Sequence, residues 1–268
     1  MNRSDATLTL GVDLGSTAIK AVLLADGMTV KACRVALTGH NARQSAEQLV
    51  AALLDEAGVT PDQVARTVAT GYGRLYYDPA DREVSEITCH ARGTRLVMPQ
   101  ARTIVDIGGQ DSKVISLADT GRVLDFAMND KCAAGTGRFL EVMSRALDVP
   151  IEQFGRLAEA STKDVAISTT CTVFAESEVV GLVARGEALP DIVAAIHRSI
   201  AARIAALVRR VGPAAPVVST GGVAQNPAAI AALATELDQP VEVAPDPQFT
   251  GAIGAALVAA ADHAEPRP

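Results

Sequence analysis

Two cysteines, Cys132 and Cys171, stand at positions where a thiol has distinctive chemistry. Cys132 precedes the glycine-rich stretch AAGTGR and a segment with helical spacing, and Cys171 precedes the similar segment VFAESEVVGLV. The N-terminus of a helix favours a thiolate, because its first N–H groups have no partner within the helix and the helix dipole is positive there. The sequence therefore predicts two reactive thiols at helix N-termini. The alternative, from spacing alone, is that both are small buried hydrophobic residues.

The spacing of the cysteines limits what they can form. The chain holds four cysteines, and the other two are Cys33 and Cys89. No pair has the C-x-x-C spacing that is typical of a zinc site within one chain. The thiols of cytosolic proteins usually stay reduced, so a disulfide framework is not expected either. The cysteines of one chain are therefore not expected to form a self-contained site.

A repeat is the second chemical feature of the chain. The segments at 11–24 and 105–117 resemble each other at an offset of 93 residues. In both, apolar β-forming residues flank a glycine turn, which predicts a hairpin with an open tip. Either segment alone is typical of an ordinary hairpin, and the duplication favours two related lobes. The alignment superposes Asp13 on Asp106, Gly15 on Gly108 and Lys20 on Lys113.

The hairpin tips are candidate phosphate sites. Glycines let main-chain N–H groups face a phosphate without obstruction by side chains. Asp13 and Asp106, at strand ends, are candidates for holding Mg²⁺ through water. If a nucleoside triphosphate is bound and hydrolysed at these tips, either Asp106 or Gln110 is expected to orient the water that attacks its terminal phosphate. The sequence does not choose between the two residues. The candidate nucleotide-binding residues of the two tips are Asp13, Gly15, Ser16, Thr17, Lys20, Gly108, Gly109 and Gln110.

A third motif lies in PVVSTGGVAQNPAAI at 216–230. It predicts a buried strand, a glycine turn and a helix that starts at Asn226 with Pro227 in its first turn. We expect Gly221, Gly222 and Gln225 to bind the nucleoside. In this order the three motifs resemble the phosphate-1, phosphate-2 and adenosine motifs of the actin, sugar-kinase and Hsp70 ATPase superfamily. The resemblance implies an α/β fold of two similar lobes, with ATP or ADP in the cleft between them.

The remaining segments supply the elements of these lobes. Helical spacing of apolar residues predicts crossover helices at 42–59 and 190–212. His197 falls on the second of these helices and receives no role. The apolar run GAIGAALVAAA at 251–261 predicts a buried helix that is too short to span a bilayer. We expect one lobe at 1–98, completed by the helix at 250–262, and a second lobe at 99–249.

Composition narrows the function classes. Of the 268 residues, 49% are of apolar types, which excludes a disordered chain. The net charge of −7 and the lack of a long basic run argue against a nucleic-acid partner. The N-terminus lacks the apolar region of a signal peptide, so the expected location is the cytoplasm, with no membrane partner.

Five motifs give a more specific resemblance: ATGYGR, SEITCHARG, NDKCAAGTGRFLE, TTCTVFAESEVVG and TGGVAQN. They look like those of the activator ATPases of 2-hydroxyacyl-CoA dehydratases. The wider family includes ATP-binding subunits of benzoyl-CoA reductase and reductases of double-cubane cluster proteins. The similarity extends from about residue 8 to 260.

The resemblance implies an ATPase coupled to electron transfer. In that family the cysteines that match Cys132 and Cys171 come from two identical subunits and together hold one 4Fe-4S cluster. An electron from ferredoxin or flavodoxin would pass through the cluster to a partner iron–sulfur dehydratase or reductase, driven by hydrolysis of Mg-ATP. Cys33 and Cys89 are then structural. A heterodimer with a paralogue, the identity of the donor and the acyl-CoA of the partner stay open.

Two functions of other classes compete with this one. A small-molecule kinase of the same superfamily, such as a sugar kinase, would leave both cysteines unexplained. A nucleotide-sensing dimer would use four thiols to hold structural zinc. Only the electron-transfer hypothesis expects iron and sulfide on the protein. It also expects ATP to move the helix that opens at Cys132, because that residue follows the second hairpin closely.

Overall fold

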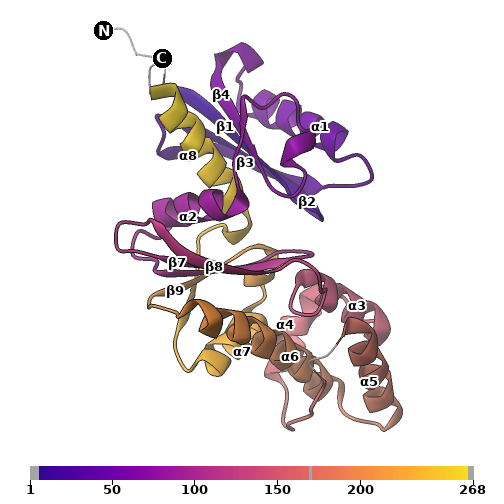
Figure 1. Ribbon diagram of the computed structural model, residues 1–268. Helices are drawn as coiled ribbons and strands as arrows, with labels where there is room; N and C mark the ends of the chain where they lie inside the picture. The colour runs from indigo at the N-terminus through magenta and orange to yellow at the C-terminus, as the bar shows by residue number, and fades with distance from the viewer. Residues whose placement is uncertain (1–5, 169–170, 265–268) are drawn as a thin grey trace. The chain divides into compact units, whose positions relative to one another are not determined.

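The computed structural model describes residues 6–168 and 171–264, and the chain divides into two compact units (Figure 1). The first unit combines the chain up to Pro99 with the segment from Gln248 onward, and the second is Gln100–Pro247. Thr169 and Thr170, which precede Cys171 in its motif, lie outside the described residues. Each unit is built on one five-stranded mixed sheet.

The sheet of the first unit has the order β3-β2-β1-β4-β5. β1 and β2 form the first hairpin, and Asp13 pairs with Lys20 in its register. β3 continues the antiparallel part, while β4 and β5 run parallel to β1. The strand bounds are β1 Leu8–Leu14, β2 Ala18–Ala25, β3 Thr29–Leu37, β4 Val64–Thr70 and β5 Arg82–Glu83.

The sheet of the second unit has the order β10-β9-β6-β7-β8. β6 and β7 form the second hairpin, and Asp106 pairs with Lys113 in its register. β8 is antiparallel to β7, β9 is parallel to β6, and β10 is parallel to β9. The strand bounds are β6 Thr103–Ile107, β7 Ser112–Leu117, β8 Val123–Asn129, β9 Val217–Thr220 and β10 Val241–Val243.

The two sheets have the same topology when the second is followed from β8 to β10. In each, two antiparallel pairings are followed by two parallel ones. The α/β fold of two similar lobes, expected from the repeated hairpin, is confirmed. The repeat is longer than the hairpin, because the parallel strands β4 and β9 are counterparts as well.

The helices of the first unit cover both faces of its sheet. Alternate residues of β1 contact opposite sides, as a period of two requires. Leu10 and Val12 pack with Leu49 and Leu53 of α1, while Thr9 donates its hydroxyl proton to the Ala256 carbonyl of α8. α2 packs against α8, so helices far apart in sequence lie side by side (Figure 1). The bounds are α1 Ala42–Glu56, α2 Glu86–Val97 and α8 Thr250–Ala264.

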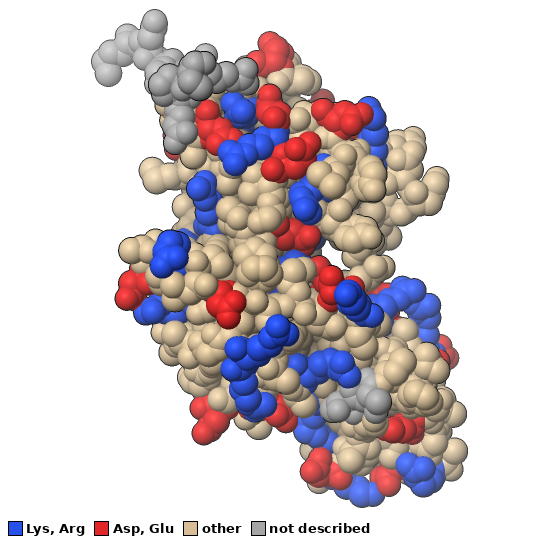
Figure 2. Space-filling view, in the orientation of Figure 1, with Lys and Arg blue, Asp and Glu red and all other residues tan. Residues whose placement is uncertain are grey.

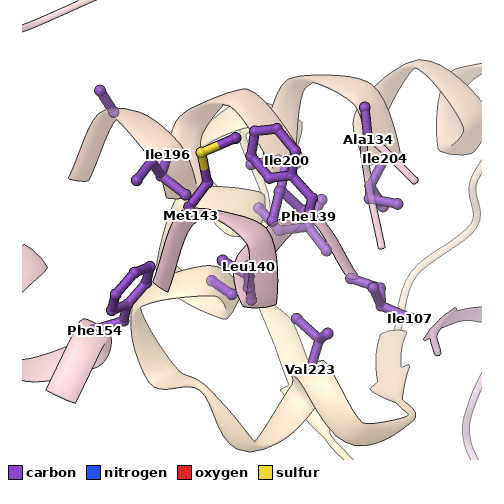
Figure 3. Close-up of a cluster of buried hydrophobic side chains, with 14 of the residues drawn as sticks. Ile107, Ala134, Phe139, Leu140, Met143, Phe154, Ile196, Ile200, Ile204 and Val223 are labelled. Carbon is purple, nitrogen blue, oxygen red and sulfur yellow. The ribbon is translucent and has the colours of Figure 1, made fainter. Parts of the chain in front are cut away.

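The core of the second unit lies between its sheet and a group of helices. Phe139, Leu140 and Met143 of α3 point toward the isoleucines of α6 (Figure 3). Ile196, Ile200 and Ile204 of α6 lie on the face that the sequence predicted and are almost fully buried. The bounds are α3 Gly137–Leu147, α4 Phe154–Glu159, α5 Thr172–Ala184, α6 Leu189–Val211 and α7 Pro227–Leu237. Short 3-10 turns occupy Pro61–Gln63, Arg74–Tyr76, Ile151–Gln153, Gly222–Gln225 and Pro247–Phe249.

One structural expectation is wrong. Cys132 does not stand at a helix N-terminus, because α3 begins at Gly137 with Thr136 as its N-cap. Cys132 lies in the loop between β8 and α3, whereas Cys171 is the N-cap of α5 as expected. None of the helices in the described residues combines the length and apolar character that crossing a membrane requires.

Candidate functional site

The first hairpin holds its aspartate in a buried ion pair. Asp13 is 5% exposed, and its Oδ2 accepts a hydrogen bond from Lys20 Nζ at 2.9 Å. The pairing follows from the register of β1 and β2, which places the two residues directly opposite each other. At the tip, the Gly15 carbonyl accepts from the Thr38 hydroxyl at 2.7 Å, and the Thr17 carbonyl accepts from the Thr38 N–H. The end of β3 therefore holds the tip in place.

The second hairpin repeats the arrangement with more partners. Asp106 and Lys113 are both almost fully buried, with Nζ 3.6 Å from Oδ2. Lys113 also bonds Asp111 at 2.7 Å, and Asp106 Oδ1 accepts from the Thr220 hydroxyl at 2.9 Å. Gln110 is exposed at the tip. The carboxylate of Asp106 is thus held from two sides.

A side chain in place of either tip glycine would meet close contacts. A Cβ on Gly15 would lie 2.7 Å from the Ala18 carbonyl, and one on Gly108 would lie 2.7 Å from Asp111 Oδ1. Distances below about 3.4 Å between such atoms force a rearrangement. The two tips therefore keep bare backbone at the positions where the sequence predicts phosphate contacts.

A threonine–glycine pair at the end of the parallel strand completes each arrangement, and the sequence analysis missed its duplication. Thr70 lies in register with Asp13, and Thr220 lies in register with Asp106. The glycine that follows has a positive φ, 91° at Gly71 and 84° at Gly221. The recurrence of T-G in ATGYGR and STGGVAQN was the signal available in the sequence.

The loop after β9 is ordered by a chain of hydrogen bonds that runs to α6. The Asn226 side-chain oxygen caps α7 by accepting from the N–H groups of Ala228 and Ala229. Its Nδ2 lies 2.9 Å from His197 Nε2, and His197 Nδ1 lies 2.8 Å from the Val193 carbonyl. Because the Asn226 NH₂ can only donate, Nε2 accepts and Nδ1 carries the proton. His197, which received no role from the sequence, therefore holds the glycine loop in place.

The pKa of His197 is lowered, because burial disfavours the charged ring. The neutral form is the one that the network requires, since a protonated Nε2 would face the Asn226 donor. Gly222 and Gln225 are exposed on the same loop. A mainly apolar hollow of about 450 Å³ lies beside Gln225, lined by Ala224, Gln225, Pro227, Ile230, Ala231, Ala234, Pro240, Val241 and Val243.

The tip of the second hairpin is bonded directly to the start of α3. The Gly108 carbonyl accepts from the Gly137 N–H at 2.8 Å, and the Gly109 carbonyl accepts from the Arg138 N–H at 2.7 Å. These are N–H groups of the first turn, which have no partner within the helix. Ser112, just after the tip, donates to the Gly135 carbonyl at 2.5 Å. The hairpin thus fixes both α3 and the end of the loop that carries Cys132.

The two cysteines of interest belong to the same unit and differ in exposure. Cys171 is exposed, and Cys132 is partly buried against the core of the second unit. Neither is in a disulfide. α3 and α5, the helices that follow the two thiols, pack against each other. In the described part of the chain, no three His, Cys, Asp or Glu side chains come together in a group that could hold a metal ion.

The first unit places a histidine close to its hairpin aspartate. His90 of α2 is 6% exposed, and its Nδ1 lies 3.1 Å from the Thr250 hydroxyl at the start of α8. A Cβ on Gly251 would lie 3.1 Å from His90 Nε2 and 3.2 Å from Asp13 Oδ2. His90 and Asp13 are thus neighbours across the bare Cα of Gly251, a proximity that the sequence did not reveal.

The remaining two cysteines differ in burial. Cys89 is fully buried, and burial raises the pKa of its thiol to about 12. Such a thiol is inert at neutral pH. Cys33 lies on β3 and is exposed.

Known proteins are similar to this chain over nearly its whole length. A model of the BadF/BadG/BcrA/BcrD ATPase family matches residues 10–259. The 2-hydroxyisocaproyl-CoA dehydratase activator of Clostridioides difficile is 45% identical over 251 residues, which are 94% of either chain. The (R)-2-hydroxyglutaryl-CoA dehydratase activating ATPase of Acidaminococcus fermentans is 46% identical, over 94% of this chain and 96% of that protein.

Solved structures agree in fold. The activator of the 2-hydroxyisocaproyl-CoA dehydratase from Clostridium difficile with bound ADPNP has a TM-score of 0.91 and 44% identity, covering 96% of both chains. A glucokinase of the ROK family from Streptomyces griseus has a TM-score of 0.59 at 14% identity, covering 94% of this chain and 99% of that one. The latter likeness shows the fold alone.

Proposed function

Because the chain belongs to the BadF/BadG/BcrA/BcrD ATPase family, we propose that it is an activator ATPase of a 2-hydroxyacyl-CoA dehydratase. The protein would accept one electron from ferredoxin or flavodoxin and pass it to the dehydratase at the expense of ATP. Relatives of that activity are about 45% identical over nearly the whole chain, and one of them binds ADPNP.

Nucleotide binding is assigned to the two hairpins and the loop after β9. The glycines leave bare backbone at the tips, which phosphate oxygens can approach without meeting a side chain. Asp13 and Asp106 each have a lysine ammonium next to a carboxylate oxygen. Direct coordination of Mg²⁺ would compete with these lysines, so contact through water, which leaves the ion pairs intact, fits the donor set better. Gly222 and Gln225 would meet the nucleoside.

Two residues remain candidates for orienting the attacking water. Asp106 is held rigidly by Thr220 and Lys113, as a group that must position a water should be. Gln110 is exposed at the tip and keeps its freedom to meet the γ-phosphate. A comparison of Asp106→Asn with Gln110→Ala in phosphate release decides between them.

The donor set of the thiols fits a 4Fe-4S cluster shared by two chains. One chain offers Cys132 and Cys171, both free of disulfides, and a cubane needs four thiolates. A two-fold axis through a homodimer would supply the other two. When bound, the cluster supplies a one-electron carrier of low potential.

The surface of α5 supports assembly next to Cys171. Ala175, Val179 and Leu182 of this helix are buried in the unit. Four further apolar side chains of this helix, Val173, Phe174, Val180 and Val183, are at least half exposed. Exposed apolar side chains beside an exposed thiol are what a second copy of the chain would cover.

One observation carries the coupling of ATP to electron transfer: the Gly108 and Gly109 carbonyls bond the first turn of α3. A phosphate that draws the N–H groups of this tip toward itself would move the same peptide units that hold α3. Cys132 lies in the loop directly before that helix. A change from ATP to ADP would therefore reach the thiol through two backbone hydrogen bonds.

The test uses anaerobically purified protein and the variant Asp106→Asn. The wild type should contain about four irons and four sulfides per dimer, absorb near roughly 400 nm, and reduce its acceptor only with ATP. Asp106→Asn should keep iron and dimer but lose the ATP-dependent reduction, because the carboxylate is not a cluster ligand. Cys132→Ala and Cys171→Ala should lose the cluster.

Each failure has its own meaning. Zinc in place of iron would favour a nucleotide-sensing dimer. Mg²⁺-dependent phosphorylation of a sugar by protein that holds neither iron nor zinc would favour a kinase. A wild-type rate in Asp106→Asn, or transfer indifferent to ATP, would contradict the coupling alone. Iron that appears only on mixing with a second family member would indicate a heterodimer, and reduction of a benzoyl-CoA or double-cubane partner would reassign the acceptor.

A further inference from the structure

We propose that Arg203 sets the reduction potential of the shared cluster by placing a permanent positive charge against the sulfur of Cys132. The inference rests on the proposed function, since it concerns the cluster that the thiols would hold. Arg203 of α6 is partly buried, and its Nη1 lies 3.8 Å from Cys132 Sγ. The resemblance to known activators pointed to the cysteines and did not point to this arginine.

The arginine is held in place by the loop that it crosses. Gly135 has a φ of 91°, and a Cβ there would lie 2.8 Å from Arg203 Cδ and 3.2 Å from its Cγ. The missing side chain thus leaves the space in which the stem of Arg203 runs. Ala134 lies next to Ile204 in the core, so the loop and α6 are packed together at this point (Figure 3).

The backbone around Cys132 is fixed as well. Asn129 donates from Nδ2 to the carbonyls of Cys132 at 2.8 Å and of Ala134 at 3.0 Å. Both the sulfur and the guanidinium are therefore attached to rigid neighbours. The distance between Arg203 Nη1 and Cys132 Sγ is therefore fixed by the packing of the second unit, unlike that of two flexible side chains on the surface.

The charged side chains of α6 beyond its first turn are all basic. After Asp191 the helix carries Arg198, Arg203, Arg209 and Arg210 and no acidic residue. Basic side chains gather on the visible face of the second unit over α6 and α7 (Figure 2). Arg198 pairs with Asp164, and Arg209 donates to the Glu236 carbonyl. Arg203 is the member of this group that contacts a proposed cluster ligand.

The effect on the potential follows from charge. One electron passes from the donor to the cluster, no proton is taken up, and the cluster with its four thiolates becomes more negative by one. A guanidinium, which stays charged at every accessible pH, interacts more favourably with that reduced state. Two copies of Arg203, one from each chain, would therefore raise the potential and let ferredoxin or flavodoxin reduce the protein before ATP is used.

The test is a redox titration of the reconstituted, nucleotide-free protein, followed by absorbance and by electron paramagnetic resonance. Arg203→Met keeps the apolar stem and removes the charge. It should lower the equilibrium constant for reduction at least tenfold, which for one electron is about 59 mV. Arg203→Lys should restore most of that shift. Arg209→Met removes the same charge from the same helix, away from Cys132, and should match the wild type.

The outcomes separate this inference from the proposed function. A wild type without iron would overturn both. An iron-loaded Arg203→Met protein with the wild-type potential would overturn only the role of Arg203. If Arg203→Met fails to hold iron, Arg203→Lys decides: a loaded cluster at or slightly below the wild-type potential supports the charge, and loss of iron in both variants overturns it in favour of a structural role.

Discussion

Gly71 and Gly221 are counterparts in the two units. Each follows the threonine that lies in register with its hairpin aspartate, and each has a positive φ. A Cβ on Gly71 would lie 2.5 Å from Asp13 Oδ1, and one on Gly221 would lie 2.9 Å from Asp106 Oδ1. The carboxylates therefore rest against bare backbone in both copies of the repeat.

Gly221→Ala should destabilise the protein and abolish nucleotide binding. The residue has φ 84° and ψ 175°, a region that is nearly exclusive to glycine, so the backbone strain alone costs about 1–3 kcal/mol. The new methyl would also lie 2.4 Å from the Ile107 carbonyl. Thermal unfolding with and without ATP measures both effects.

Gly222→Ala is the matched control. Nothing lies within 4 Å of a Cβ at this position, so the stability should stay at the wild-type value. Nucleotide affinity should fall, because the methyl would occupy the surface assigned to the nucleoside. Equal loss of stability in both variants would contradict the steric argument.

Thr220→Val should remove the hydrogen bond by which β9 holds the Asp106 carboxylate in position. The change keeps the shape and removes the hydroxyl that donates to Asp106 Oδ1. Loss of a buried hydrogen bond to a charged group costs about 1.5–3 kcal/mol. We expect a lower unfolding temperature and slower phosphate release, with Thr220→Ser close to the wild type. Unchanged hydrolysis in Thr220→Val would exclude a positional role for this bond.

Acid should weaken the protein through His197. Burial lowers the pKa of this ring from 6.5, so the unfolded chain binds a proton at a pH where the folded protein does not. The free energy of unfolding then falls as pH drops from 6.5 toward the folded-state pKa, and is unaffected by this residue above that window. Denaturant unfolding between about pH 7.5 and about pH 5.5 measures the slope.

His197→Gln provides the comparison, because its amide can still accept from Asn226 and does not titrate in this range. Its stability should depend less on pH than that of the wild type. The same slope in both proteins would assign the acid sensitivity to other groups.

Alkylation should separate the exposed cysteines from the buried Cys89 in iron-free protein. Cys33 and Cys171 are exposed and should react first. Cys89 should react only on unfolding, because it is fully buried and the pKa of its thiol is raised to about 12. Mass spectrometry after a short pulse of iodoacetamide gives the order. Reconstitution with iron and sulfide should protect Cys132 and Cys171 but not Cys33, and continued labelling of Cys171 would count against its role as a ligand.

Local patterns were sufficient to predict much of this protein. The aspartate, glycine and lysine of each hairpin are close in sequence, and antiparallel pairing across a short turn follows from their spacing. The sequence likewise predicts the apolar faces of α6 and α8 and the capping of α7 by Asn226, because each depends only on residues close together in the chain. Cys132 and Cys171 stand out by type and context, so the sequence alone indicated which residues are of interest.

The tertiary structure decided what those residues touch. α3 begins at Gly137 and not, as the sequence predicts, at Cys132. Its first N–H groups donate to the Gly108 and Gly109 carbonyls, and a helical pattern of apolar residues does not predict this contact. Parallel pairing of β4 and β9 with distant strands brought the threonine–glycine pairs to the aspartates. The packing of α6 against the loop between β8 and α3 placed Arg203 next to the sulfur of Cys132. These contacts join residues that are far apart along the chain, so the local propensities of the sequence do not predict them.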